Sequence, residues 1–219
     1  MKELLKKIFL SKKISSIKDH KFQELKDKSE VNKIFDAING YNNISEVRYV
    51  GGCVRKILNK ENTDDIDLAT NLTPDQVKVC LDNSKIKYFE TGLEHGTITA
   101  KIDNQNFEIT TLRKDVKTDG RHAIVEYTTN WEEDALRRDF TINSIYSDID
   151  GNLYDPNNGH KDLINGIIKF IGEPETRIKE DYLRIIRYLR FYSGYSNVDH
   201  ELNIITVSYT HLTLPTSNS

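Results

Sequence analysis

The sequence contains few of the residues that mark several large classes of protein. It has only two cysteines, Cys53 and Cys80, and six scattered histidines, so its composition indicates neither a disulfide scaffold nor a zinc knuckle. No apolar run approaches the roughly 18 residues that a membrane-spanning helix requires, which excludes a helical membrane protein. Four prolines and 37% hydrophobic residues are typical of a globular chain. We therefore expect a soluble protein without a membrane partner, and the lack of a disulfide pattern favours the reducing cytoplasm.

The sequence also lacks an excess of positive charge. Its formal net charge is −3, from 31 lysines and arginines against 34 acidic residues, so no global field attracts phosphate. A nucleic-acid surface would have to be local. Residues 1–18 carry six lysines and one acid, which predicts a basic N-terminal segment over residues 1–28. A solvated helix is the simpler interpretation of that segment, and contact with RNA is the alternative.

Helical and strand patterns intermix over the first half of the chain. Apolar residues spaced as on one helical face predict a helix with Ser29 as its cap and Asn39-Gly40 as its stop. Thr73-Pro74 is expected to start another helix. Further elements are predicted from the pattern: a short helix over 54–59, strands over 46–50, 65–70 and 87–91, and a hairpin of 96–102 with 107–113. We therefore expect an α/β (α+β) domain around one mixed, largely antiparallel sheet.

The chain becomes more polar after this hairpin. Residues 111–130 have little apolar periodicity, so they are predicted to form a mobile loop beside a site. A helical pattern resumes over residues 131–146. Residues 146–156 then predict a second hairpin around Asp150-Gly151.

The last part of the chain is predicted to be helical. Residues 175–193 fit one continuous helix, with Leu183, Ile186 and Leu189 as its apolar face. We place a domain boundary near residues 166–175. The expected domains are a basic segment over 1–28, a head domain over 29–166, a truncated helical region over 167–206, and a disordered or non-native tail over 207–219.

The pattern "DDIDLAT" carries the first chemical signal. Residues two apart in a strand share a face, so Asp65 and Asp67 should project together while Ile66 enters the core. Paired carboxylates are the hard oxygen ligands that Mg²⁺ prefers. Glu108 alternates on the neighbouring hairpin strand and could join them in a two-metal site. A solvated acidic turn is the alternative for the aspartates, and a structural pair with Arg113 is the alternative for Glu108.

A glycine pair precedes these aspartates by about twelve residues. Gly51 and Gly52 follow a predicted strand and precede a predicted helix, where backbone without side chains can approach a phosphate group closely. Arg55 would add a positively charged fork. Most such glycine pairs only make turns, so this signal depends on the aspartates beyond it.

These patterns belong to an ordered series of motifs between Arg48 and Phe191. The motifs are "GGCVRKIL" with "DDIDLAT", then "FEITTLR", "TDGRHA", "RRDFTIN", "DPNNGHKDLINGIIKFIG" and "EDYLRIIRYLRF". In this order they resemble the class II tRNA nucleotidyltransferases, which are the CCA-adding enzymes, and the related bacterial poly(A) polymerases. The resemblance implies a polymerase-β-like head followed by a helical neck, with Asp65 and Asp67 as ligands of catalytic Mg²⁺.

The resemblance also implies roles for further residues. In "RRDFTIN", Arg137 or Arg138 would meet phosphate while Asp139 and Asn143 would lie near the sugar; pairing of Asp134 with Arg138 is the simpler alternative. Arg113 is also expected to bind the nucleotide. In "TDGRHA", Arg121 and His122 would belong to a flexible loop.

The predicted neck helix suggests how a base could be read. Asp181, Arg184 and Arg187 stand three apart, so on a continuous helix they would share one polar stripe. A carboxylate accepts and a guanidinium donates, which suits the amino donor and ring-nitrogen acceptor of cytosine and adenine. Uracil and guanine present the reverse order. Arg190 would extend the positive stripe toward phosphate or the primer end, and a surface salt bridge is the alternative for the Asp181–Arg184 pair.

The expected activity is addition of C and A to the 3′ end of tRNA from CTP and ATP, with release of pyrophosphate. A poly(A) polymerase is the first alternative, and a non-catalytic nucleotide-binding fragment is the second. Members of the family continue into body and tail domains that hold tRNA, whereas this sequence stops in or just after the predicted neck. We therefore expect a fragment, and no protein partner can be named from the sequence.

Overall fold

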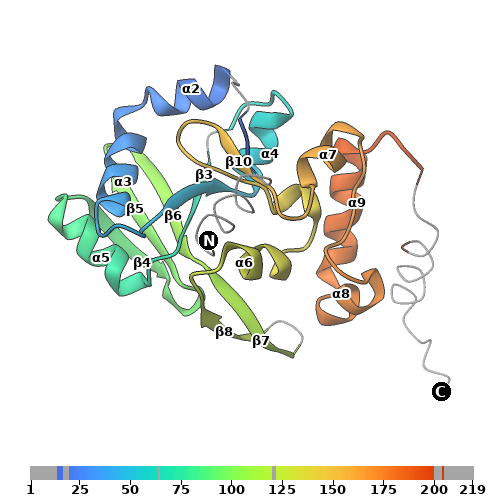
Figure 1. Cartoon of the computed structure of the whole chain (residues 1–219). Coiled ribbons are helices and arrows are strands. Elements are labelled where there is room, and N and C mark those ends of the chain that lie inside the picture. Colours follow the sequence, from blue (N-terminus) through green and yellow to red (C-terminus); the bar gives the residue numbers. More distant parts are fainter. Residues whose placement is uncertain (1–13, 17–19, 64, 120–121, 200–203, 205–219) are drawn as a thin grey trace, which may run out of the picture.

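The computed structural model describes residues 14–16, 20–63, 65–119, 122–199 and 204. Its central feature is an eight-stranded sheet with the order β1-β10-β9-β2-β3-β6-β5-β4 (Figure 1). The strand pairs of this sheet are antiparallel except for β3 with β6. The strands are β1 (Ile14–Ser16), β2 (Val47–Val50), β3 (Ile66–Thr70), β4 (Lys87–Gly92), β5 (Thr97–Ile102), β6 (Gln105–Thr111), β9 (Tyr146–Ser147) and β10 (Asn152–Tyr154). The predicted mixed, largely antiparallel sheet is confirmed.

Helices surround this sheet and continue beyond it. They are α2 (His20–Lys26), α3 (Ser29–Asn39), α4 (Gly52–Leu58), α5 (Pro74–Asn83), α6 (Trp131–Arg137), α7 (Gly159–Ile164), α8 (Pro174–Glu180) and α9 (Leu183–Tyr195). The predicted helix start at Thr73-Pro74 is confirmed, and the Thr73 side chain caps the helix by accepting from the Gln76 amide in a capping box. Ser29 is instead the first residue of α3, and Lys28 occupies the cap position without a side-chain hydrogen bond. The helix still stops at Asn39 as predicted.

The two faces of the central strands differ because side chains alternate along each strand. Leu68, Phe107, Ile109 and Ile98 are fully buried in a core with residues of α3 and α5. The intervening residues, which include Asp67 and Glu108, point to the opposite face. The strand alternation therefore directs the acidic side chains away from the core.

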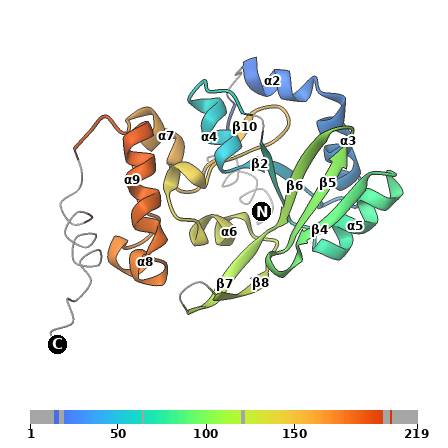
Figure 2. The ribbon, with the colours of Figure 1, turned by 180° about the vertical axis from the view of Figure 1, so that it is seen from behind.

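The polar segment after β6 is not a loop, and that prediction was wrong. It forms a two-stranded antiparallel ribbon of β7 (Arg113–Asp119) and β8 (His122–Tyr127), which Figure 2 shows next to β6. Backbone pairing between the two strands supplies the hydrogen bonds, so no apolar face marks them in the sequence. Within the "TDGRHA" motif, Gly120 and Arg121 lie outside the described residues, and so does the side chain of His122.

The helix expected over residues 131–146 is also shorter than predicted. Helix α6 ends at Arg137, and Phe140 then forms an isolated antiparallel bridge with Phe170. A 3₁₀ turn follows at Thr141–Asn143. The second predicted hairpin is confirmed by β9 and β10.

The C-terminal helical region consists of two helices where one was predicted. The chain is extended at Asp181 (φ −156°, ψ 107°), which separates α8 from α9. The predicted apolar face of α9 was also wrong: Leu183, Ile186 and Leu189 are 46%, 61% and 47% exposed.

The buried face of α9 is instead largely aromatic. Ile185, Tyr188 and Phe191 pack in a second core with Phe140 and Phe170. The ring centroids of Phe140 and Phe170 are 4.6 Å apart, and those of Phe140 and Phe191 are 5.4 Å apart. This core joins residues on both sides of position 166, and the division into domains there stays a prediction. Among the described residues, no helix combines the length and apolar character needed to span a bilayer.

Candidate active site

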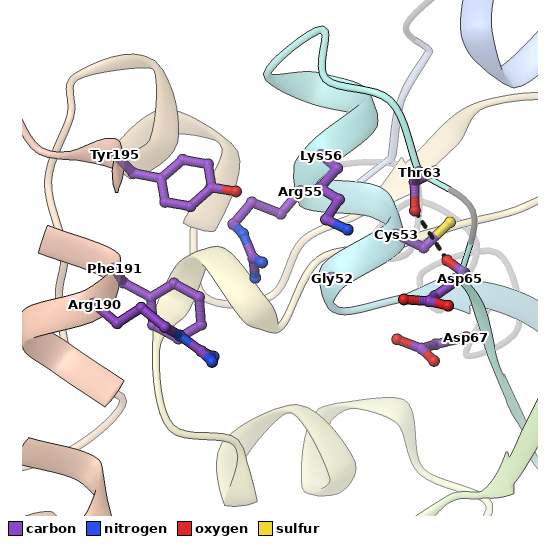
Figure 3. Close-up of a pocket in the computed structure, with 10 residues that line it drawn as sticks. All are labelled: Gly52, Cys53, Arg55, Lys56, Thr63, Asp65, Asp67, Arg190, Phe191 and Tyr195. Carbon is purple, nitrogen blue, oxygen red and sulfur yellow. Dashed lines mark hydrogen bonds between the residues drawn. The ribbon is translucent and has the colours of Figure 1, made fainter. Parts of the chain in front are cut away.

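Two carboxylates project from the same face of the sheet at β3. Asp65 precedes the first residue of the strand and Asp67 is its second residue, and Figure 3 shows both side chains close together opposite Gly52. Glu108 is the register partner of Asp67 on β6. Asp65 and Asp67 line a hollow of about 470 Å³, and Asp67 and Glu108 line an adjoining one of about 490 Å³. The structure therefore brings the three predicted carboxylates together.

The charge around Asp67 favours a cationic partner. Burial raises the pKa of the Asp67 carboxyl, and the nearby Glu108 and Asp65 carboxylates raise it further, against Arg138 and Lys56. A divalent cation would relieve this repulsion, and carboxylate oxygen is its preferred ligand. Among the described residues, no three His, Cys, Asp or Glu side chains meet as a ready-made metal cluster. The residues present thus fit a metal that shares its coordination with a bound substrate.

The glycine pair lies directly beside these carboxylates. Gly51 has φ 67° and ψ −125°, a backbone conformation that residues other than glycine rarely adopt. A Cβ atom on Gly52 would lie 3.9 Å from Asp67 Oδ2 and 3.8 Å from Arg55 Nη2. The bend therefore leaves bare backbone between the carboxylates and a guanidinium group, as the sequence predicted.

Replacing Gly51 with alanine tests whether the bend requires glycine. Its positive φ should cost about 1–3 kcal/mol of unfolding free energy in the variant. Gly194→Ala is the matched control, because Gly194 lies within α9 with no atom near its Cβ position. That control should stabilise the protein by about 0.5–1 kcal/mol. Urea denaturation should give a lower unfolding free energy for the Gly51 variant and a higher one for the Gly194 variant. Equal changes in the two variants would contradict this account of Gly51.

Arg55 connects the head to α9. Its Nη1 atom donates a hydrogen bond to Asn143 Oδ1, and its guanidinium carbon lies 4.6 Å from the ring centroid of Phe191 and 5.0 Å from that of Tyr195. The side chain is only 8% exposed and lines both hollows. Stacking on two aromatic rings fixes the direction of its charge. The sequence indicated the arginine, but not the rings that hold it.

Arg138 forms the ion pair that sequence reasoning gave as the alternative to phosphate binding. Its Nη2 atom lies 3.0 Å from Asp134 Oδ2, and Arg137 Nη2 lies 2.7 Å from Asp134 Oδ1. Tyr146 donates its hydroxyl to the same carboxylate at 2.6 Å. Burial opposes the charge on Asp134, but Arg138, Arg137 and Tyr146 outweigh it and lower its pKa to about 2. Both arginines nevertheless line the second hollow.

Asp139 and Asn143 follow α6 in the chain, and Asp139 contacts α9 through Arg187. Asp139 Oδ1 accepts from Asn143 Nδ2 at 2.9 Å, and Asp139 Oδ2 accepts from Arg187 Nε at 2.7 Å. Burial alone would raise the pKa of Asp139, but Arg187 and Asn143 lower it. Both residues and Arg187 line the second hollow. The structure thus brings these three predicted residues together, with Arg187 already paired to an acid.

The proposed base-reading pair lies elsewhere in this structure. Arg184 Nη1 donates to Glu180 Oε2 at 2.6 Å and to the Arg177 carbonyl at 2.8 Å. Asp181 Oδ1 accepts from the Leu183 amide at 3.0 Å. Because Asp181 precedes α9, the expected polar stripe on one helix does not form. Neither residue is among those that line the two hollows around the carboxylates.

The remaining predicted residues lie at the edges of the second hollow. Arg113 lines it and donates from Nη1 to the His95 carbonyl at 2.5 Å. No ion pair between Arg113 and Glu108 occurs in the described part of the chain. Arg190 lines both hollows, with its guanidinium 5.0 Å from the Phe191 ring centroid.

The lining residues that were not foreseen include Lys56, Phe191 and Tyr195. Lys56 and Arg55 adjoin on α4, and Phe191 and Tyr195 are four residues apart on α9. The i, i+4 spacing of two aromatic residues could have indicated a shared face. Nothing in the sequence alone places that face against α4.

Comparison with known proteins extends this picture. The family described as "Poly A polymerase head domain" matches residues 47–169. The mitochondrial CCA tRNA nucleotidyltransferase 1 of Homo sapiens is 53% identical over 148 residues, which cover 67% of this chain and 34% of that protein. A CCA-adding enzyme of Oceanobacillus iheyensis is 41% identical over 157 residues, covering 71% of this chain and 37% of that protein. The chain thus spans about a third of the length of these relatives.

Solved structures show the same likeness. The CCA-adding enzyme of Bacillus stearothermophilus in complex with CTP superposes with a TM-score of 0.69 at 29% identity, covering 82% of this chain and 43% of that one. A tRNA nucleotidyltransferase complexed with a primer tRNA and an incoming ATP analog superposes with a TM-score of 0.61 at 25% identity, covering 77% of this chain and 47% of that one.

Proposed function

This chain belongs to the poly(A) polymerase head-domain family, and from that premise we propose that it is the catalytic head of an RNA nucleotidyltransferase. The reaction proposed is addition of C and A to the 3′ end of tRNA from CTP and ATP without a nucleic-acid template. The observation that carries the proposal is the convergence of Asp65, Asp67 and Glu108 beside the glycine bend. The human and bacterial relatives named above support the choice of CCA addition.

The groups around the hollows suit a nucleoside triphosphate. Arg55, Lys56 and Arg190 place positive charge opposite the carboxylates, where a triphosphate needs neutralisation. Gly51 and Gly52 leave room for phosphate oxygens to approach the backbone. Arg138 is held by Asp134 and donates from Nη1 to the Asn143 carbonyl, so it offers phosphate only the N–H groups that these bonds leave over. Asp139 and Asn143 lie beside these groups and are assigned to the sugar.

Enzymes of this class generally use divalent metals, and we assign Mg²⁺ to Asp65 and Asp67. When bound, it supplies activation of the attacking hydroxyl and neutralisation of the leaving pyrophosphate. Glu108 adds negative charge beside Asp67 and favours retention of the cation. In the reaction, the oxygen of the RNA 3′-hydroxyl attacks the α-phosphorus and forms the new phosphodiester bond, while the hydroxyl proton passes to solvent. The bond from the α-phosphorus to the oxygen that bridges to the β-phosphate breaks, and pyrophosphate leaves with that oxygen.

Asp181 and Arg184 keep their proposed role as readers of the base, but with a condition. In this structure Arg184 is bound to Glu180 and Asp181 to a backbone amide. Reading a base therefore requires Arg184 to exchange these partners for the nucleotide.

The cytoplasmic location stays a prediction. The relatives differ in this respect, because the human one is mitochondrial and the other is bacterial.

Extension assays with each nucleotide tested separately distinguish the candidate functions. A tRNA transcript without its CCA end should gain C from CTP alone and a terminal A only after C has been added. A poly(A) polymerase, which the family description favours as the second candidate, would tail unrelated RNA with ATP alone. A fragment that binds nucleotide without transfer would release no pyrophosphate with any RNA. Either of the last two results would contradict the proposed specificity.

A further inference from the structure

The face of the sheet that carries the carboxylates continues beyond them, across β6 and β5, to the edge strand β4. Asp67 pairs in register with Glu108, Glu108 with Thr99, and Thr99 with Phe89. Register partners point to the same face of a sheet. A second row on this face contains Asn106, Lys101 and Lys87. The active face therefore runs from the acidic groups to two lysines and an aromatic ring.

This end of the face is open and positively charged. Phe89 is 52% exposed, although the opposite face of the same strands is buried under helices. Phe89, Lys87 and Lys101 also line a hollow of about 580 Å³ at the end of these strands, which Lys33 of α3 and Lys85 after α5 border from the helix-covered side. Asp103 is the one acid in that lining. No ion pair of these four lysines occurs among the described residues, so four positive charges face one acid in this lining, in a chain whose net charge is −3.

Hydroxyl groups connect the two ends of the face. Thr97 and Thr110 are hydrogen-bonded at 2.9 Å and both line the second hollow beside Glu108. Thr91 and Thr99 are hydrogen-bonded at 2.6 Å next to Phe89. These small polar side chains lie between the two ends of the face, whereas α3 and α5 pack in the core on the opposite face. The surface is therefore continuous from the carboxylates to the edge strand.

We propose that this face, from Glu108 across Thr99 to Phe89, Lys87 and Lys101, binds the RNA strand that leads to the 3′ end being extended. The inference rests on the proposed function. Lysines suit the phosphate backbone of RNA, and an exposed ring offers a stacking surface that tolerates any base. The nucleotide side of the carboxylates is occupied by Arg55 and Arg190, so the strand approaches from the opposite side, over β5 and β4.

The distance between Asp67 and Phe89 determines which nucleotide of the RNA strand would contact the Phe89 ring. Neighbouring strands lie about 4.8 Å apart, so three strand spacings put Phe89 about 14 Å from Asp67. Stacked nucleotides rise about 3.4 Å each along one strand, so the ring meets the strand roughly four nucleotides before the 3′ end. An RNA of three nucleotides bound at the carboxylates would not reach it.

Binding of a labelled eight-nucleotide RNA and of a three-nucleotide RNA tests this length dependence, with fluorescence anisotropy as the readout and no nucleotide present. Phe89→Ala should weaken binding of the eight-nucleotide RNA about five- to a hundredfold, because stacking on one base is lost. The double variant K87E/K101E should weaken it at least tenfold and reduce its salt slope by about 1.4, because two phosphate contacts are lost. Binding of the three-nucleotide RNA and of CTP should not change.

Matched controls come from exposed residues elsewhere. Lys161→Glu changes a solvent-exposed lysine on α7, and Tyr41→Ala removes a 39%-exposed ring next to α3; both should bind RNA like the wild type. Wild-type affinity and salt slope in the Phe89 and lysine variants would overturn the proposal, as would equal wild-type affinity for the two RNA lengths. If these dependences hold but no pyrophosphate is released, the RNA surface stands and the proposed function fails.

Discussion

Replacing Asp67 with asparagine is expected to reduce nucleotide transfer by about 10³-fold or more without unfolding the protein. The carboxylate lies between Asp65 and Glu108 and beside the glycine bend, so on the proposed assignment its loss removes a ligand of the metal beside the reacting phosphate. Metal stabilisation of transition-state charge contributes several kcal/mol, and about 4 kcal/mol corresponds to a thousandfold change in rate. Pyrophosphate release with Mg²⁺ measures the loss. Asp75→Asn, on the exposed surface of α5, is the control and should retain wild-type activity.

The same substitution should preserve or raise stability. The folded-state pKa of Asp67 is raised by burial and by Glu108 and Asp65, so ionising this group disfavours the folded state. A raised pKa contributes stability below the unfolded-state value, and that contribution is lost as pH rises through the folded-state value. At neutral pH without metal, Asp67→Asn removes this cost. A melting temperature well below that of the wild type would contradict the interpretation, as would retention of a tenth of the activity.

Replacing Asp134 with asparagine is expected to have the largest effect on stability. This carboxylate is 1% exposed and receives hydrogen bonds from Arg137, Arg138 and the Tyr146 hydroxyl. Removing one partner of a buried ion pair leaves the other charge uncompensated, which costs about 3–5 kcal/mol. For a protein of this size the melting temperature should fall by roughly 10 °C. Asp75→Asn removes a surface ion pair and should cost less than about 1 kcal/mol.

The pH dependence provides an independent check on Asp134. Its folded-state pKa is lowered to about 2 from a usual value near 3.8. A lowered pKa contributes stability above the unfolded-state value, and that contribution is lost as pH falls through the folded-state value. Wild-type unfolding free energy should therefore fall between about pH 4 and pH 2 more steeply than that of Asp134→Asn. Parallel curves for the two proteins would contradict this ion pair as the source of stability.

A double-mutant cycle separates the pair from its surroundings. Asp134→Asn and Arg138→Gln together should destabilise the protein by less than the sum of the single changes, because the second change removes the charge that the first leaves unpaired. Strict additivity would show that the two side chains do not interact. Additivity would also mean that Asp134 does not hold Arg138, which would then be free to make a full phosphate contact.

Local chemistry in the sequence was enough to predict the sheet and the acidic site. Alternation along residues 65–70 required Asp65 and Asp67 to share a face, since Ile66 and Leu68 had to enter the core. The glycine requirement at Gly51 and the cap at Thr73 are equally local, because backbone conformation and a three-residue hydrogen bond determine them. Local patterns failed for residues 111–130, where cross-strand backbone bonds make a ribbon without an apolar stripe.

Only the tertiary structure decided which partners the arginines and the last helix take. Asp139 meets Arg187 across 48 residues, and Arg55 meets Asn143 across 88, and no periodicity encodes such distances. The buried face of α9 is Tyr188 and Phe191 because aromatic rings from Phe140 and Phe170 already form the surface against which it packs. The sequence by itself determined the strand that presents the carboxylates, while long-range packing decided which charges surround them.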